Sequence, residues 1–291
     1  MTTPPPPSSE LMDPGALRVL TPESVLAALR LVRYGRIYDL GVDLGLDTPR
    51  LPPDSVAPFS LSQFRTPASF SEIAEMRGNS FSNEVIYGGL HQSCHIDALI
   101  HAQRHGRVYG GTTVSELLSD FGWARHGMET VPPIVARGVL LDLAAAAHTE
   151  RLPDETCVSG TAVRAAVERQ GVTLREGDAV LARTGKIRQY ATDRPGFERA
   201  CPGLAGHAAA WLAEQGMVLF GIDATSADPL PTPNWDDTVH EELLVRRGIH
   251  IVENLYLEEL ARDGVTEFLF LCLPLRLKGA TGSWVRPVAL V

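Results

Sequence analysis

The sequence lacks a hydrophobic run long enough to cross a membrane. Its most apolar stretch, Phe268 to Leu275, has the length of a strand, whereas a membrane-spanning helix needs about 20 apolar residues. The proline- and serine-rich N-terminus also lacks the basic and apolar order of an export signal. We therefore expect a cytoplasmic protein without membrane partners.

Basic residues are in short supply as well. The chain has 26 lysines and arginines against 35 aspartates and glutamates, which gives a formal net charge of -9. Because nucleic acids and anionic lipid surfaces repel such a chain, we expect neither as a partner.

Cysteine is scarce, and its spacing matches no metal-binding pattern. The four cysteines form no CxxC pair, so free thiols are expected in a cytosolic protein. Cys272 lies in the apolar run and is assigned to the core. Cys94 lies inside a histidine cluster, where packing, metal ligation and nucleophilic attack are all open to it.

Apolar patterns of strand and helix period alternate along most of the chain. Strands are expected at 36–40, 136–143, 178–183, 217–222, 249–252 and 267–275, and helices from Thr21 and at 159–170, 206–215, 239–247 and 258–262. This alternation predicts an α/β fold with some parallel pairing. Residues 1–20 are expected to be a disordered tail, 21–291 a single domain, and 41–81 a long loop.

The segment from Leu90 to His105, LHQSCHIDALIHAQRH, concentrates residues that bind zinc and related metals. A continuous helix would turn Asp97 away from His91 and His95, and a strand would separate His91 from His101 too widely. A strand that turns into a helix capped by Asp97 avoids both problems. We therefore predict that His91, His95 and Asp97 converge on a metal, with His101 beside them.

Other polar residues are interpreted by their positions. His105 and His126 have no such support and are expected to face solvent. Glu253 ends an apolar strand, where either a metal or an arginine would compensate its burial. Asp223 also follows a strand, and capping a loop is favoured there over support of a ligand.

The pattern HQSCHIDALIH resembles the His-x-Gly-Thr-His-x-Asp-x-Pro-x-His signature of the cyclase family, which includes bacterial kynurenine formamidases and isatin hydrolases. GIDATSAD with HEELLVRRGIHIVENL resembles that family's second signature, and LCLPLRLKGATGSWVRPVAL its C-terminal strand pair. RTG at Arg183 to Gly185 fits as well. The resemblance runs from about Tyr38 to the C-terminus.

The resemblance implies a swivelling β/β/α domain with a mixed sheet, assembled as a homodimer or homotetramer. It implies one or two zinc or manganese ions per chain. It assigns the metal to His91, His95, Asp97, His240 and Glu253, and the catalytic role to His101. The sequence departs from the family pattern at Ser93-Cys94, Leu99 and Trp284.

These observations predict a hydrolase that opens or cleaves a C–N bond in a small formamide, amide, lactam or cyclic imide. Metal-bound hydroxide would attack the carbonyl carbon, with His101 as general acid and base. Phe81 and Trp284 are assigned to the substrate pocket, and Trp123 and Trp235 either to it or to the core. Three alternatives stay open: a ring-forming or dehydrating enzyme using the same metal, a metal-free Cys94–His hydrolase, and a binding protein that keeps the fold.

Overall fold

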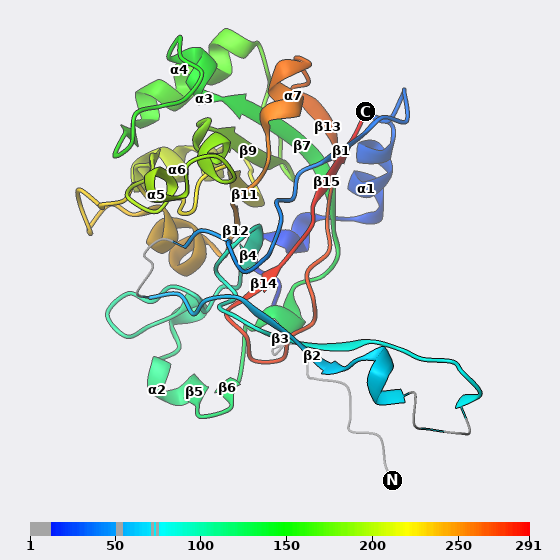
Figure 1. Cartoon of the computed structure of the whole chain (residues 1–291). Helices are drawn as coiled ribbons and strands as arrows, with labels where there is room; N and C mark the ends of the chain where they lie inside the picture. The colour runs from blue at the N-terminus through cyan, green and yellow to red at the C-terminus, as the bar shows by residue number, and fades with distance from the viewer. Residues whose placement is uncertain (1–12, 51–54, 71–72, 74–75) are drawn as a thin grey trace.

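A mixed sheet forms the centre of the molecule, which we describe from a computed structural model covering residues 13–50, 55–70, 73 and 76–291 (Figure 1). Within these residues the sheet has nine strands, in the order β1 (Ile37–Asp39), β15 (Val288–Leu290), β13 (Glu267–Cys272), β7 (Ile134–Asp142), β9 (Ala179–Arg183), β11 (Leu219–Ile222), β12 (His250–Glu253), β4 (His95–Asp97) and β14 (Gly282–Trp284). β7, β9, β11 and β12 run parallel to one another. The outer pairs are antiparallel. This architecture confirms the predicted α/β class with a mixed sheet in one domain.

Helices cover both faces of the sheet (Figure 1). The α-helices are α1 (Pro22–Leu29), α2 (Val114–Leu117), α3 (Leu143–Ala146), α4 (Gly160–Gln170), α5 (Arg194–Phe197), α6 (Gly206–Glu214) and α7 (Glu258–Arg262). The element η8 (Glu241–Arg247) is a π-helix. Among the described residues there are also five 3₁₀ turns: η2 (Gly15–Val19), η3 (Pro67–Phe70), η5 (Tyr109–Gly111), η6 (Met128–Thr130) and η7 (Lys186–Gln189). Three short pairs complete the described elements: β2 (Ser60–Arg65) with β3 (Asn83–Tyr87), β5 (Leu118–Ser119) with β6 (Gly122–Trp123), and β8 (Cys157–Val158) with β10 (Gly203–Leu204).

Two apolar cores lie on opposite faces of the sheet. Val180 and Ala182 of β9 pack into the core formed with α4, α6 and η8. Ala179 and Leu181 of the same strand join the other core, with Leu17. This alternation follows from the two-residue period of a strand, and it explains why both faces of β9 are apolar.

Most of the expected elements form where local patterns place them. Thr21 caps α1 by accepting a hydrogen bond from the Ser24 amide, and the helix expected at 239–247 forms as the π-helix η8, closed by left-handed Gly248. Of the expected tail, residues 13–20 are described: η2 packs on the body, and the Ala16 amide donates to the Gly248 carbonyl. Residues 1–12 lie outside the described part.

Two local expectations are wrong. The expected loop at 41–81 contains β2, whose residues pair with β3 in a ribbon that extends away from the sheet (Figure 1). The helix expected after Asp97 is a turn, in which the His101 amide donates to Ala98 O. Pairing with the C-terminal segment favours this turn over a helix, because the Ala98 amide donates to Thr281 O at 2.8 Å.

The RTG segment, Arg183 to Gly185, joins parts of the scaffold. Arg183 forms ion pairs with Asp142 and Glu258. Both oxygens of buried Asp223 accept hydrogen bonds from Thr184 and Gly185. Asp223 therefore caps this loop, as expected.

No helix in the described residues combines the length and the apolar character required to span a membrane.

Candidate metal centre

Strand β4 positions the centre of the site. It lies between β12 and β14, with His95 opposite Glu253 and Asp97 opposite Gly282. Because side chains alternate along a strand, His95 and Asp97 point to the same face, and directly opposed Glu253 points with them. Sheet register thus brings these three side chains together from distant parts of the sequence.

Nitrogen and oxygen atoms converge at this point. His95 Nε2 lies 3.3 Å from Glu253 Oε2 and 3.6 Å from Asp97 Oδ1. His240, at the start of η8, brings its Nε2 to 3.6 Å from Asp97 Oδ2 and 3.5 Å from Glu253 Oε1. All four side chains come from the residues predicted as ligands.

The hydrogen bonding of His95 tests whether this group fits a cation. His95 Nδ1 donates to Ser93 O at 2.9 Å, so in the neutral ring Nε2 carries the lone pair. Among the described residues, neither buried His95 Nε2 nor buried Asp97 Oδ2 has a hydrogen-bond partner. Acceptors that face one another in a buried place are stabilised by a proton or a cation between them. The donor set therefore fits a divalent ion that accepts nitrogen and oxygen ligands.

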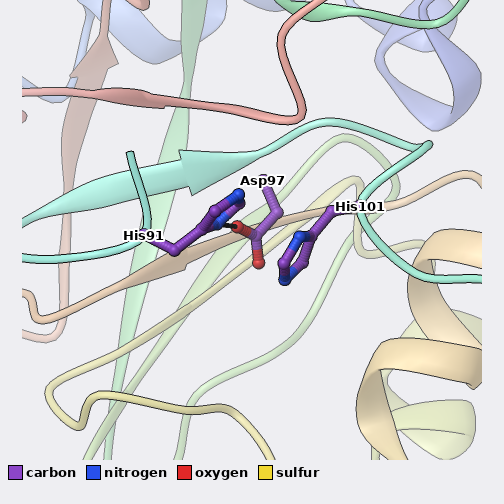
Figure 2. A group of neighbouring side chains, drawn as sticks. All are labelled: His91, Asp97 and His101. Atoms are coloured by element: carbon purple, nitrogen blue, oxygen red, sulfur yellow. Dashed lines mark hydrogen bonds and ion pairs between the residues drawn. The ribbon is translucent and has the colours of Figure 1, made fainter. Parts of the chain in front are cut away.

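His91 and His101 form a second group around Asp97 (Figure 2). His91 Nδ1 lies 2.8 Å from Asp97 Oδ1, and its Nε2 lies 2.9 Å from Thr281 Oγ1. The His101 ring stacks on His91 with centroids 3.8 Å apart. Asp97 is common to both groups of candidate ligands, so the geometry accommodates one ion or two.

The charges around the site shift the pKa values of its histidines. Burial opposes the charged form of His240, but hydrogen bonding to Asp228 and the charges of Glu253, Asp228 and Asp97 raise its pKa to about 10. Burial also opposes protonation of His95, yet Glu253 and Asp97 raise its pKa. The dense negative charge that produces both shifts attracts cations.

His101 behaves in the opposite way. Burial lowers its pKa to about 3 in spite of the Asp97 charge, with His91 and His240 adding to the decrease. The imidazole is therefore uncharged at neutral pH, with a lone pair on one ring nitrogen.

The site opens into a cavity of about 470 Å³, a size suited to a small organic molecule. His91, His101, His240 and Glu253 form part of its lining, and Trp235 lies at the same cavity. The sequence assigns Trp235 and one other tryptophan either to the substrate pocket or to the core. The other, Trp123, packs against the core.

The two aromatic residues assigned to the substrate pocket are not among the described residues that line this cavity. Phe81 precedes β3 and contacts Phe70, with 61% of its surface exposed. Trp284 donates through Nε1 to Gly89 O and packs against Phe59. Neither side chain therefore lines this cavity within the described residues, and their assignment to a substrate pocket stays a prediction.

Cys94 belongs to the core beneath the site. It is buried among apolar residues, and burial raises the pKa of its thiol well above the usual value. This environment opposes thiolate formation, so it does not support a metal-free Cys94–His hydrolase. Of the two histidines expected to face solvent, His105 does. His126 is instead buried beside Tyr109.

Three further residues support the predicted ligands. Asp228 accepts from His240 Nδ1 at 2.6 Å, Thr281 contacts His91, and Asn254 donates to Ser93 O. Asp228 and Asn254 lie inside the segments GIDATSAD and HEELLVRRGIHIVENL, so their positions carried a signal. Their partners become evident only in the folded chain.

Comparisons with known proteins place the chain in a family. The family model described as putative cyclase matches residues 38–229. Kynurenine formamidase from Bacillus cereus is 35% identical over 124 residues, which are 42% of this chain and 53% of that enzyme. The chain thus matches about half the length of this curated relative.

Solved structures extend the likeness over nearly the whole chain. A crystal structure of a novel cyclase has a TM-score of 0.85 and 27% identity, and the alignment covers 96% of both chains. An isatin hydrolase bound to the product analogue thioisatinate has a TM-score of 0.68 and 20% identity, covering 94% of this chain and 99% of that one. At that lower identity the second structure supports the fold alone.

Proposed function

Because the chain belongs to the putative cyclase family, we propose that it is a metal-dependent hydrolase of a non-peptide C–N bond. The substrate class is a small formamide, amide, lactam or cyclic imide. The convergence of His95, Asp97, Glu253 and His240 beside a cavity carries this proposal. The name of the formamidase relative supports the bond type.

The proposed ligands are His91, His95, Asp97, His240 and Glu253. A divalent zinc or manganese ion bound by such ligands lowers the pKa of a water molecule and polarises a carbonyl group. Asp228 fixes the orientation of His240 by accepting from its Nδ1, which leaves His240 Nε2 directed at Asp97 and Glu253.

His101 is the proposed proton carrier. Its ring lies at the cavity and against His91. As water adds to the carbonyl carbon, His101 accepts the proton that the water loses. It then donates this proton to the departing nitrogen as the C–N bond breaks. The products are a carboxylic acid and an amine, which remain one molecule when the substrate is a ring.

A second candidate reaction is ring formation with loss of water, which the description of the family as cyclases supports. The two reactions differ in the fate of water. Hydrolysis in H₂¹⁸O places the label in the product carboxylate, whereas dehydration introduces no label.

We also propose that the enzyme acts in the cytoplasm as a homo-oligomer. The apolar side chains exposed on the β2–β3 ribbon support association with other copies of the chain.

The decisive experiment is elemental analysis of protein purified without added metal. Wild type is expected to carry one or two equivalents of zinc or manganese and to hydrolyse members of a formamide, lactam and cyclic imide panel. His95→Ala should lose the metal and the activity, while His207→Ala, at an exposed histidine of α6, should lose neither. Wild type without metal that also takes none up on reconstitution would refute the proposal.

A further inference from the structure

One backbone carbonyl connects two residues at the metal centre. Ser93 O accepts from His95 Nδ1 at 2.9 Å and from Asn254 Nδ2 at 2.8 Å. All three residues are buried. Asn254 directly follows the candidate ligand Glu253, so it joins the β12 end of the site to the β4 end.

Both ends of this connection have an uncommon backbone conformation. Ser93 has φ 55° and Asn254 has φ 57°, in the left-handed region that disfavours most side chains. The turn before β4 thus holds the Ser93 carbonyl toward His95 Nδ1 in a conformation that the serine itself does not prefer. A donor from outside this turn stabilises that orientation.

The hydrogen bonding of Asn254 shows what its side chain provides. Its Nδ2 donates to Ser93 O, whereas its buried Oδ1 lacks a partner within the described part of the chain. The opposite amide orientation would set two acceptor oxygens against each other, so the donor role is fixed. Glycine would adopt the same backbone without burying an unpaired oxygen. The contribution specific to asparagine is thus the hydrogen bond to Ser93.

We infer that Asn254 is a positioning residue that sets the metal affinity of the site through the Ser93 carbonyl and the His95 ring. With Ser93 O held in place, His95 keeps its proton on Nδ1 and directs the Nε2 lone pair toward Asp97 and Glu253. Without the amide, the turn keeps the bonds from Ser93 Oγ to Val42 O and Asp43 O, but the carbonyl that orients the His95 ring is held less firmly. This inference rests on the metal site of the proposed function.

The test is cobalt binding by the full-length chain, followed by visible absorption and by competition with a chelator. In Asn254→Gly the left-handed backbone is retained, while the side chain and its hydrogen bond to Ser93 are lost. Loss of such a supporting hydrogen bond is expected to weaken cobalt binding about 10- to 100-fold. Glu155→Gly is the matched control, because Glu155 also has a positive φ, of 67°, and is exposed. It should bind cobalt as wild type does.

The outcomes separate this inference from the proposed function. Folded Asn254→Gly with wild-type affinity overturns the inference alone. Failure of wild type to bind cobalt overturns both.

A measurement on unchanged, zinc-loaded protein covers the case in which Asn254→Gly does not fold. Long-range ¹H–¹⁵N NMR should find the His95 proton on Nδ1, and one Asn254 amide proton should be protected from exchange. A His95 proton on Nε2, or two freely exchanging amide protons, would contradict the inference.

Discussion

His240 Nδ1 donates to Asp228 Oδ2 over 2.6 Å, and the same carboxylate accepts from the Val239 and His240 amides. This carboxylate therefore orients the ring and begins η8 at the same time. Because three N–H groups donate to this carboxylate, an NH₂ group in place of either oxygen would face a donor.

Asp228→Asn is accordingly expected to weaken metal binding about 10- to 100-fold, because the amide nitrogen would face a donor. Chelator competition measures the effect, and circular dichroism reports whether the fold is kept. Wild-type affinity in a folded variant would show that Asp228 does not orient His240.

His101→Asn should lower kcat about 10²- to 10⁴-fold, the usual contribution of a general acid and base. Metal content should stay at the wild-type value, because His101 is proposed to carry a proton and not to bind the ion. The matched control is His105→Asn, at an exposed histidine with φ 49°, where asparagine suits the backbone. Loss of metal in His101→Asn would reassign His101 as a ligand.

Thiol reactivity should distinguish the four cysteines. Burial raises the pKa of Cys94, Cys201 and Cys272, to about 12 for the last two, so at pH 8 they hold very little thiolate. Cys157 is exposed. A chromogenic disulfide reagent should therefore react with one thiol in the folded protein and with four after denaturation. Rapid reaction of Cys94 with loss of activity would instead favour the thiol hydrolase.

Gly185→Ala should destabilise the protein by about 2–4 kcal/mol. Gly185 has φ 80°, and an added Cβ would lie 2.3 Å from Glu150 O, so a left-handed penalty of about 1 kcal/mol adds to overpacking of about 1–3 kcal/mol. Gly171→Ala has a similar φ of 65° with open space around it, and it should cost only the first part. Urea denaturation of both variants measures the difference.

The β2–β3 ribbon should mediate self-association. A two-stranded hairpin is marginally stable alone, and Leu61 and Ile86, which are directly opposed, are 48% and 55% exposed. The double variant Leu61→Ser/Ile86→Ser should be a folded monomer by analytical ultracentrifugation, whereas wild type should be a homo-oligomer. Leu26→Ser, at an exposed residue of α1, should assemble as wild type does. A monomeric wild type would contradict this prediction.

Local signals in the sequence are sufficient for much of the fold. The cap at Thr21, the stop at Gly248 and the apolar run of β9 each depend on neighbouring residues alone. The grouping of His91, His95 and Asp97 was likewise predictable from their spacing, because they lie on one strand and the turn before it.

Features that depend on distant partners were harder to predict. The turn after Asp97 is fixed by Thr281, and the burial of His126 depends on Tyr109. Phe81 lies near the ribbon because 60–65 pair with 83–87, a choice that periodicity in an irregular segment does not reveal.

The placement of β4 between two strands has a consequence for engineering. A one-residue slip of β4 would turn His95 and Asp97 to the opposite face, and pairing with both β12 and β14 opposes such a slip. Trp235, in contrast, belongs to a loop outside the sheet. Mutagenesis libraries confined to residues 232–235, which leave Asp228 in place, should therefore be able to diversify substrate choice while keeping the ligand geometry unchanged.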